Sequence, residues 1–114
     1  MRRLTGILLL LCLSLTVVTG TITPSHAQSH QLVLYVAEYC SHCRLAERYL
    51  RERGVKVAIR DITQSARFHH EWKDSYHGDI VPVLVLDQGR AVLDGFERHQ
   101  YDHFLKNHRI PTRN

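Results

Sequence analysis

The sequence predicts an α/β domain in which a four-stranded mixed sheet is flanked by helices, with the elements in the order β-α-β-α-β-β-α. Two observations support this class. Short apolar runs rich in β-branched and aromatic residues alternate with longer segments whose apolar residues recur at helical spacing. The length of 114 residues leaves room for one domain.

The first half of the pattern runs from a strand through a helix to a second strand. Residues 31–36 read Gln-Leu-Val-Leu-Tyr-Val, which is typical of a buried strand. Residues 40–53 predict a helix that ends at Gly54, because glycine just past the last turn is a C-terminal stop. Its apolar face would carry Leu45, Ala46, Tyr49 and Leu50. Residues 55–61 alternate apolar with polar or small residues and predict the second strand.

A second helix is expected to start at a cap formed by Thr63 or Ser65, to extend to about residue 76, and to end at His77-Gly78. Three aromatic residues recur along it at a spacing of four and are interpreted as core and not as a cofactor site. They are Phe68, Trp72 and Tyr76.

The C-terminal part is expected to form a hairpin followed by a helix. Residues 80–86 are nearly all apolar and predict a strand, which Pro82 interrupts. A turn at residues 87–90 and a short strand at 91–93 complete the hairpin. The last helix, 97–107, would bury Tyr101, Phe104 and Leu105.

The order of these elements predicts how the strands pair. Strands linked by helices are expected to pair in parallel through right-handed crossovers, whereas the short turn makes the last two strands antiparallel. The first strand would then deliver Cys40 to the N-terminus of the first helix. In open α/β sheets that edge is where ligands bind.

The N-terminal segment has the layout of a secretory signal peptide. It begins Met-Arg-Arg, continues with an apolar run at residues 4–18, and reaches a small-x-small cleavage site, Ser-His-Ala, at residues 25–27. The alternative is a retained membrane anchor over residues 4–22, which is marginally long enough to span a bilayer. Cleavage is favoured because Thr, Ser and Gly interrupt the run. We therefore expect a periplasmic or secreted protein.

Export would divide the chain into a signal peptide (1–27), a domain (28–110) and a C-terminal tail (111–114). The formal net charge of +4 falls to +2 without the leader, which is too small a surplus for binding to nucleic acid. An apolar fraction of 44% excludes a disordered chain. We expect a monomer with no nucleic-acid partner.

Only two cysteines remain after export, Cys40 and Cys43, in the motif Cys-Ser-His-Cys. A disulfide stabilises mainly by closing a long loop, and two intervening residues close almost none. Structural zinc normally needs four ligands, and no second pair follows. Haem attachment needs a histidine directly after the second cysteine, where this chain has Arg44. Redox chemistry is the leading interpretation, and no metal ligands are predicted.

The position of the two sulfurs predicts their roles. A cysteine at a helix N-terminus faces unpaired amide donors and the positive end of the helix dipole, and both favour the thiolate. Thiols in such motifs reach pKa values of about 3.5 to 7. Cys40 is therefore expected to be the nucleophile, and Cys43, one turn further in, the resolving thiol.

His42, between the cysteines, is expected to modulate this chemistry. Its ring N–H or charge could stabilise the Cys40 thiolate, which would make the disulfide more oxidising. The alternative is that His42 is a polar side chain that faces solvent.

The segment from about residue 32 to residue 105 resembles glutaredoxin. The motifs that carry the resemblance are Tyr39-Cys40-Ser-His-Cys43 after a strand, Ile80-Val81-Pro82 before a hairpin, and Asp94-Gly95-Phe96 before the last helix.

This resemblance implies a thioredoxin-like fold in which Pro82 is cis and lies beside the cysteines. It leaves the amide and the carbonyl of Val81 free to pair with a substrate backbone, and it implies substrate contacts at Tyr39, Gly95 and Phe96. The implied activity is dithiol exchange with protein disulfides or glutathione mixed disulfides, with an upstream reductant or oxidant as a further partner.

The chain departs from the family pattern where glutathione is held. Ala37 stands where many glutaredoxins have a lysine for a glutathione carboxylate, and Ile80 replaces a threonine. Asp94 replaces the first glycine of a Gly-Gly corner, and His69 replaces a glutamine or arginine. Glutathione is therefore a doubtful reductant, and no bound cofactor is expected.

Two further sites stay open as alternatives. Cys40 could bind a metal or a [2Fe–2S] cluster instead of attacking a disulfide. His99 and His103 have the i, i+4 spacing of a chelating pair on the last helix, although no third ligand is evident. An oxidoreductase should titrate two thiols with a defined potential, whereas a metal module should carry stoichiometric metal.

Overall fold

The computed structural model describes residue 20 and residues 29–113. Apart from Gly20, the expected signal peptide and its cleavage site lie outside the described residues, and so does the last residue of the tail. Within the part that is described, no helix has both the length and the apolar composition needed to cross a membrane.

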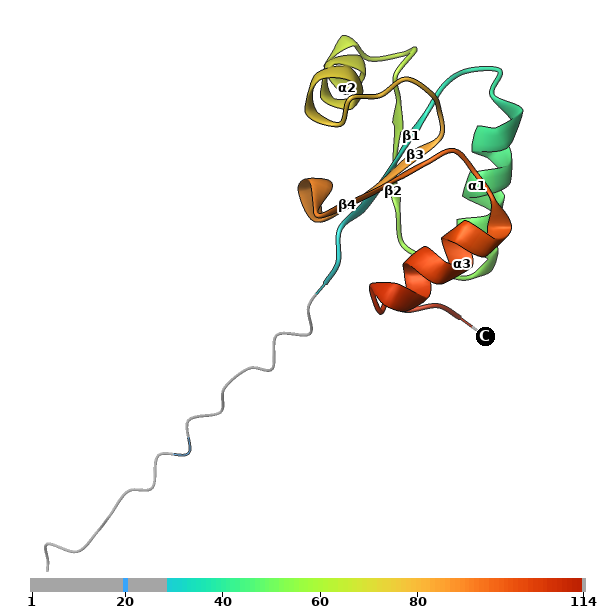
Figure 1. Cartoon of the computed structure of the whole chain (residues 1–114), viewed down its shortest axis with the longest axis vertical. Coiled ribbons are helices and arrows are strands. Elements are labelled where there is room, and N and C mark those ends of the chain that lie inside the picture. Colours follow the sequence, from blue (N-terminus) through green and yellow to red (C-terminus); the bar gives the residue numbers. More distant parts are fainter. Residues whose placement is uncertain (1–19, 21–28, 114) are drawn as a thin grey trace, which may run out of the picture.

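The described chain forms a four-stranded sheet with helices on both faces (Figure 1). The strands are β1 (Leu32–Val36), β2 (Ala58–Asp61), β3 (Val83–Leu86) and β4 (Ala91–Asp94). The helices are α1 (Ser41–Glu52), α2 (Ala66–His70) with its π-helical continuation η1 (Glu71–Ser75), the 3-10 turn η2 (Asp87–Gly89), and α3 (Arg98–Asn107). The expected element order and the mixed four-stranded sheet are confirmed.

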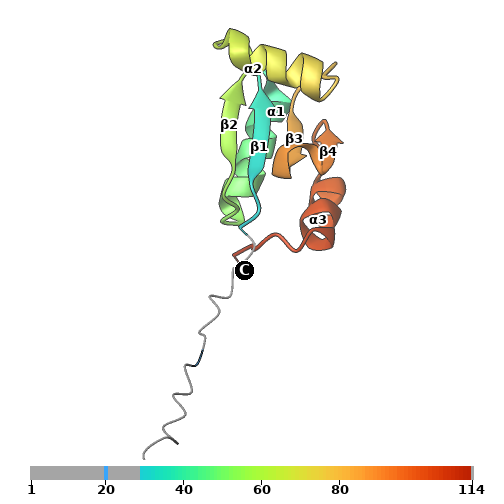
Figure 2. The ribbon, with the colours of Figure 1, turned by 90° about the vertical axis from the view of Figure 1, so that its left-hand side faces the viewer.

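The strand pairing differs in one respect from the expectation. The sheet order is β2-β1-β3-β4, with β1 parallel to β2 but antiparallel to β3. The prediction that helix-linked strands pair in parallel is therefore wrong for β2 and β3. The connecting helix lies across the end of the sheet where β2 leaves it, so the chain enters β3 from that same end (Figure 2). Its ten residues span about 15 Å, enough to pass over two strand spacings of about 4.8 Å.

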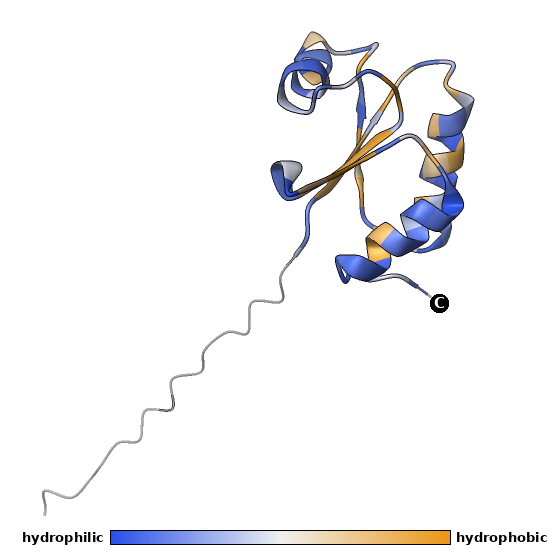
Figure 3. Ribbon diagram, in the orientation of Figure 1, coloured by the Kyte–Doolittle hydropathy of each residue, from blue (hydrophilic) through white to orange (hydrophobic). Residues whose placement is uncertain are grey.

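Two apolar clusters hold the helices to the sheet. Alternate residues of β1 face α1 and α3, and they pack with Ala46, Leu50 and Leu105. The other face packs against η1, and its members are Val33, Tyr35, Val83, Val85 and Trp72. Figure 3 shows the corresponding concentration of hydrophobic residues along the strands.

The helix α1 ends as expected, but the face that it buries is narrower than the sequence predicted. Gly54 has a φ of +65°, a conformation that glycine adopts without strain. Its N–H donates to the carbonyl of Arg51, and the N–H of Val55 donates to that of Leu50, which closes the helix. Leu45, expected on the buried face, is 43% exposed because it lies at the margin of the contact stripe.

The second strand is shorter than expected. It starts at Ala58 and not at Val55, and Ile59 is 44% exposed. The physical reason is that β2 is an edge strand, so one flank of it has no neighbour. Phe68 and Tyr76, expected in the core with Trp72, are half-buried.

Two buried tyrosines make the stability of the folded protein depend on pH in the alkaline range. The hydroxyl of Tyr49 donates to Asp102 and that of Tyr35 donates to Glu71, and burial, the largest cause, raises the pKa of each to about 12. The folded state therefore holds a proton that the unfolded chain releases at about pH 10. This stabilisation is complete below pH 10 and is lost as the pH rises toward 12. Urea unfolding at several pH values should show a shallower alkaline loss for Tyr49→Phe than for the natural protein.

Candidate active site

The two cysteines lie at the N-terminal end of α1, just after the loop that follows β1. Cys40 is the N-cap residue of α1, and its sulfur accepts a hydrogen bond from the backbone N–H of Cys43 at 3.1 Å. The two residues form a disulfide, with their Cα atoms 5.2 Å apart. Cys40 is half-buried, whereas Cys43 is only 2% exposed. A partner can therefore approach the Cys40 sulfur more readily than that of Cys43.

A loop with a cis peptide bond lies against the disulfide. The bond between Val81 and Pro82 is cis, as the resemblance implied. The Cys40 sulfur is 3.9 Å from the Val81 carbonyl oxygen. Among the backbone hydrogen bonds of residues 29–113 outside the helices and strands, none uses the N–H of Val81. This amide is thus available to an incoming backbone.

The indole of Trp72 holds this loop in place. Its Nε1–H donates to the carbonyl of Ile80 at 3.1 Å, and its ring occupies the space beside Gly78. The sequence indicated Trp72 only as a core residue. Its second role could have been suspected from a general rule, since the N–H of a buried indole usually has a hydrogen-bond partner.

The corner at Gly95 supports the loop from the other side. The Gly95 N–H donates to the Pro82 carbonyl at 2.7 Å, and Gly95 has a φ of +76°. The Tyr101 hydroxyl donates to the Gly95 carbonyl at 3.2 Å. Phe96 packs edge-on against Tyr101 and Tyr49, with ring centroids 4.9 and 5.7 Å apart. Gly95 and Phe96 therefore lie next to the cis-proline loop, which lies next to Cys40.

Tyr39 stands out from the surface beside the disulfide. It is 89% exposed and has a φ of +60°. The preceding residue is anchored, because the Glu38 N–H donates to Thr63 Oγ1 at 3.2 Å. Sequence reasoning considered Thr63 only as a helix cap, and the cap is Ser65, whose hydroxyl accepts the N–H of Phe68.

His42 lies in the first turn of α1 and is exposed. Among the hydrogen bonds of the described residues, none joins its ring to the Cys40 sulfur. Its influence on the cysteines is thus a prediction that depends on its proximity in the helix.

The N-terminus of α3 is closed by its own cap. Glu97 accepts hydrogen bonds from the backbone N–H groups of His99 and Gln100, at 3.1 and 2.9 Å. These two bonds hold the pKa of the Glu97 carboxyl below its ordinary value. Two of the amides at this helix end are therefore already engaged.

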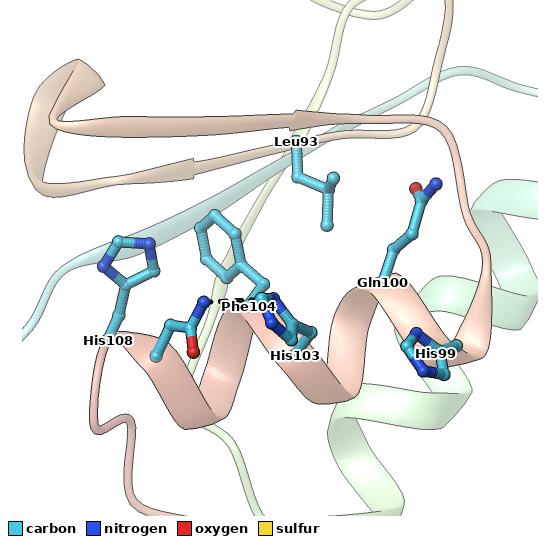
Figure 4. A pocket seen from close by; sticks show the side chains of 7 residues that line it. Leu93, His99, Gln100, His103, Phe104 and His108 are labelled. Carbon is cyan, nitrogen blue, oxygen red and sulfur yellow. Dashed lines mark hydrogen bonds between the residues drawn. The ribbon is translucent and has the colours of Figure 1, made fainter.

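The pair of histidines on α3 lines a different part of the molecule. His99 and His103 border a groove of about 350 Å³ beneath β4, together with Leu93 and Phe104 (Figure 4). The Nδ1 atom of His103 lies 3.0 Å from the side-chain nitrogen Nδ2 of Asn107. Within the described residues, no group of three or more His, Cys, Asp or Glu side chains could hold a metal ion.

Comparisons with known proteins agree with this geometry. The sequence model of the glutaredoxin family matches residues 32–90. No curated protein matches the chain.

Solved structures with the same fold share little sequence with this chain. The thioredoxin-like protein BC3987 superposes with a TM-score of 0.60 at 20% identity, over 66% of this chain and 100% of that one. Glutaredoxin 1 from Francisella tularensis superposes with a TM-score of 0.52 at 20% identity, over 68% of this chain and 99% of that one. The glutaredoxin from Archaeoglobus fulgidus superposes with a TM-score of 0.53 at 18% identity, over 69% of this chain and 89% of that one.

Proposed function

The chain belongs to the glutaredoxin family, and from this membership we propose that it is a thiol–disulfide oxidoreductase acting through Cys40 and Cys43. Its substrates would be disulfides in client proteins or mixed disulfides with glutathione. The observation that carries the proposal is the placement of Cys40 at the cap of α1, with its sulfur 3.1 Å from a backbone N–H. That N–H can stabilise a thiolate at the position where attack on a disulfide requires one.

The reaction is a two-electron exchange in two steps. In the reduced protein, the Cys40 thiolate attacks one sulfur of the substrate disulfide and forms a mixed disulfide, and the other substrate sulfur leaves as a thiolate. Cys43 then loses its proton and attacks the Cys40 sulfur, which releases the second substrate thiolate. The substrate disulfide gains two electrons, and the Cys40–Cys43 disulfide is formed. The reverse sequence oxidises a substrate dithiol.

The surrounding residues have distinct roles in this proposal. The free N–H and carbonyl of Val81 would pair with the substrate backbone, and buried Pro82 would hold Val81 beside the sulfur. Tyr39 would contact the substrate on one side of Cys40. Gly95 and Phe96 would contact it on the other.

A redox titration tests the proposal directly. Equilibration against glutathione redox buffers, with free thiols counted at each ratio, should show two thiols appearing together at one defined potential. We expect a value above about −270 mV and below about −120 mV. Stoichiometric metal or a [2Fe–2S] cluster in the purified protein, with no such titration, would favour the binding-module alternative.

His42 should tune this potential. Replacing His42 with alanine leaves the amides of α1 in place but removes the imidazole two residues after Cys40. Losing about 1.4 kcal/mol of thiolate stabilisation would lower the potential by about 30 mV, so the disulfide becomes harder to reduce. The same redox titration, with Ser41→Ala as the matched control, measures the change. An unchanged potential would leave His42 as a solvent-facing side chain.

We propose that the protein acts after export, as a monomer, on client proteins and with an upstream electron donor or acceptor. The support is the charged start, the apolar run and the Ser-His-Ala site of the leader. N-terminal sequencing of protein from the cell envelope should give a chain that begins near Gln28. An intact Met1 in the membrane fraction would instead indicate the retained anchor.

A further inference from the structure

We propose that the surface around the disulfide selects protein disulfides flanked by apolar and basic residues, and that it disfavours anionic partners such as glutathione. This inference rests on the oxidoreductase function proposed above, and it names the substrate class of that site.

Three loops converge on the disulfide, at residues 37–40, 79–82 and 94–97. The first two meet where the Cys40 sulfur lies 3.9 Å from the Val81 carbonyl oxygen. The second and third meet in the 2.7 Å hydrogen bond from the Gly95 N–H to the Pro82 carbonyl. A partner that exchanges with Cys40 must therefore lie against these loops.

The charges on the three loops are all negative. Each loop carries at least one exposed acidic residue, and none carries a lysine or an arginine; the acidic residues are Glu38, Asp79, Asp94 and Glu97. The Cα of Glu38 is at most about 7.6 Å from that of Cys40, since two peptide units separate them. The Glu38 side chain therefore starts within one Debye length of Cys40, which is about 8 to 10 Å at ordinary salt. Two cations offset part of this charge, since Lys73 pairs with Asp79 at 3.2 Å and exposed Arg98 directly follows Glu97.

Three of the backbone donors at the two helix N-termini beside the disulfide are already used. Helix N-termini bind anions through their free N–H groups. At α3 the side chain of Glu97 accepts hydrogen bonds from the N–H groups of His99 and Gln100. At α1 the Cys40 sulfur accepts a hydrogen bond from the N–H of Cys43. The two carboxylates of glutathione would lie among acidic side chains and without these three donors.

The same loops expose apolar side chains beside the sulfur. Tyr39 is 89% exposed and Ile80 is 51% exposed. The Cδ1 atom of Ile80 lies 3.6 Å from the place where a Cβ on Gly95 would be, so Ile80 covers this corner. Exposed aromatic side chains such as Tyr39, surrounded by a polar rim, are typical of surfaces that bind proteins.

Single-turnover kinetics with designed peptide disulfides test the proposal. The reduced protein, freed of excess reductant, is mixed with peptides that differ only in whether the cysteine is flanked by Lys, Gln or Glu, and with glutathione disulfide. At about 20 mM salt we expect the Lys peptide to react about five to ten times faster than the Glu peptide and glutathione disulfide. At about 0.5 M salt the difference should nearly vanish.

Charge-reversal variants assign the preference to the loops. Glu38→Lys and Asp94→Lys should reverse the order of the Lys and Glu peptides. Glu52→Lys, at the far end of α1, makes the same charge change and should keep the original order. Rates with neutral 4,4′-dithiodipyridine and far-UV circular dichroism confirm that each variant is folded and has an accessible thiol.

The outcomes separate this proposal from the proposed function. Equal rates for the Lys and Glu peptides, or an equal change in Glu52→Lys and the loop variants, would overturn the charge selection and leave the oxidoreductase function intact. If no peptide disulfide reacts faster with the protein than with free cysteine, the proposed function fails as well.

Discussion

Replacing Cys40 with serine should abolish disulfide exchange, whereas Cys43→Ser should stop the reaction halfway, with a substrate bound to Cys40. The reason is the difference in position between the two sulfurs. Cys40 is half-buried at the cap of α1 beside Val81, and Cys43 is 2% exposed one turn further in. The first step needs the accessible thiolate, and the second needs only a neighbouring thiol.

Mass spectrometry of the Cys43→Ser protein after mixing with a peptide disulfide measures this outcome. The expected adduct is one peptide per chain, attached at Cys40 and released by dithiothreitol. Ser41→Ala, which leaves both sulfurs in place, serves as the control and should turn over normally. A stable adduct on Cys43 in the Cys40→Ser protein, with exchange retained, would reverse the two roles.

Replacing Gly78 with alanine should cost about 2 to 3 kcal/mol of unfolding free energy. An added Cβ would come too close to the indole of Trp72, whose ring fills the space next to this glycine. The indole cannot shift freely, because it is buried and its N–H donates to the carbonyl of Ile80. Ile80 precedes Val81, whose carbonyl oxygen lies 3.9 Å from the Cys40 sulfur. A displaced indole would shift this loop, so we also expect slower disulfide exchange at Cys40.

A double-mutant cycle with Trp72→Leu identifies the cause. The ring atoms nearest to the Cβ position of Gly78 all belong to the five-membered part of the indole, and leucine has no ring there, so Gly78→Ala should be less costly in the Trp72→Leu background. Urea unfolding of the four proteins gives the coupling free energy. Equal costs in both backgrounds would show that the contact with Trp72 is not the source of the destabilisation.

The sequence made the position of Cys40 predictable because two strong local signals meet there. The apolar run that became β1 ends just before the motif, and the apolar spacing of Ala46, Tyr49 and Leu50 identified α1. A cysteine between a buried strand and an amphipathic helix must lie at the helix N-terminus. The cis-proline loop followed from the family resemblance and not from local pattern.

The course of the chain between β2 and β3 could not be predicted in this way. Periodicity predicted a helix there but not its direction, which depends on packing between distant parts of the sequence. Trp72 packs against Val33, Tyr35 and Val83 on the sheet face opposite α1. Gly78 looked like a helix stop, and its second role, which is to leave room for the indole, is visible only once the fold brings the two together.

The transfer of a disulfide from substrate to the Cys40–Cys43 pair is the central claim, and a stoichiometric single turnover tests it most directly. The reduced protein, freed of reductant and metal chelator, is mixed with one equivalent of a protein disulfide, and thiols and masses are followed together. We expect one Cys40–Cys43 disulfide, with the loss of two hydrogen atoms from the chain, for each substrate disulfide converted to two thiols. A substrate that stays oxidised while Cys40 and Cys43 remain thiols, or bind metal in stoichiometric amount, would contradict the account.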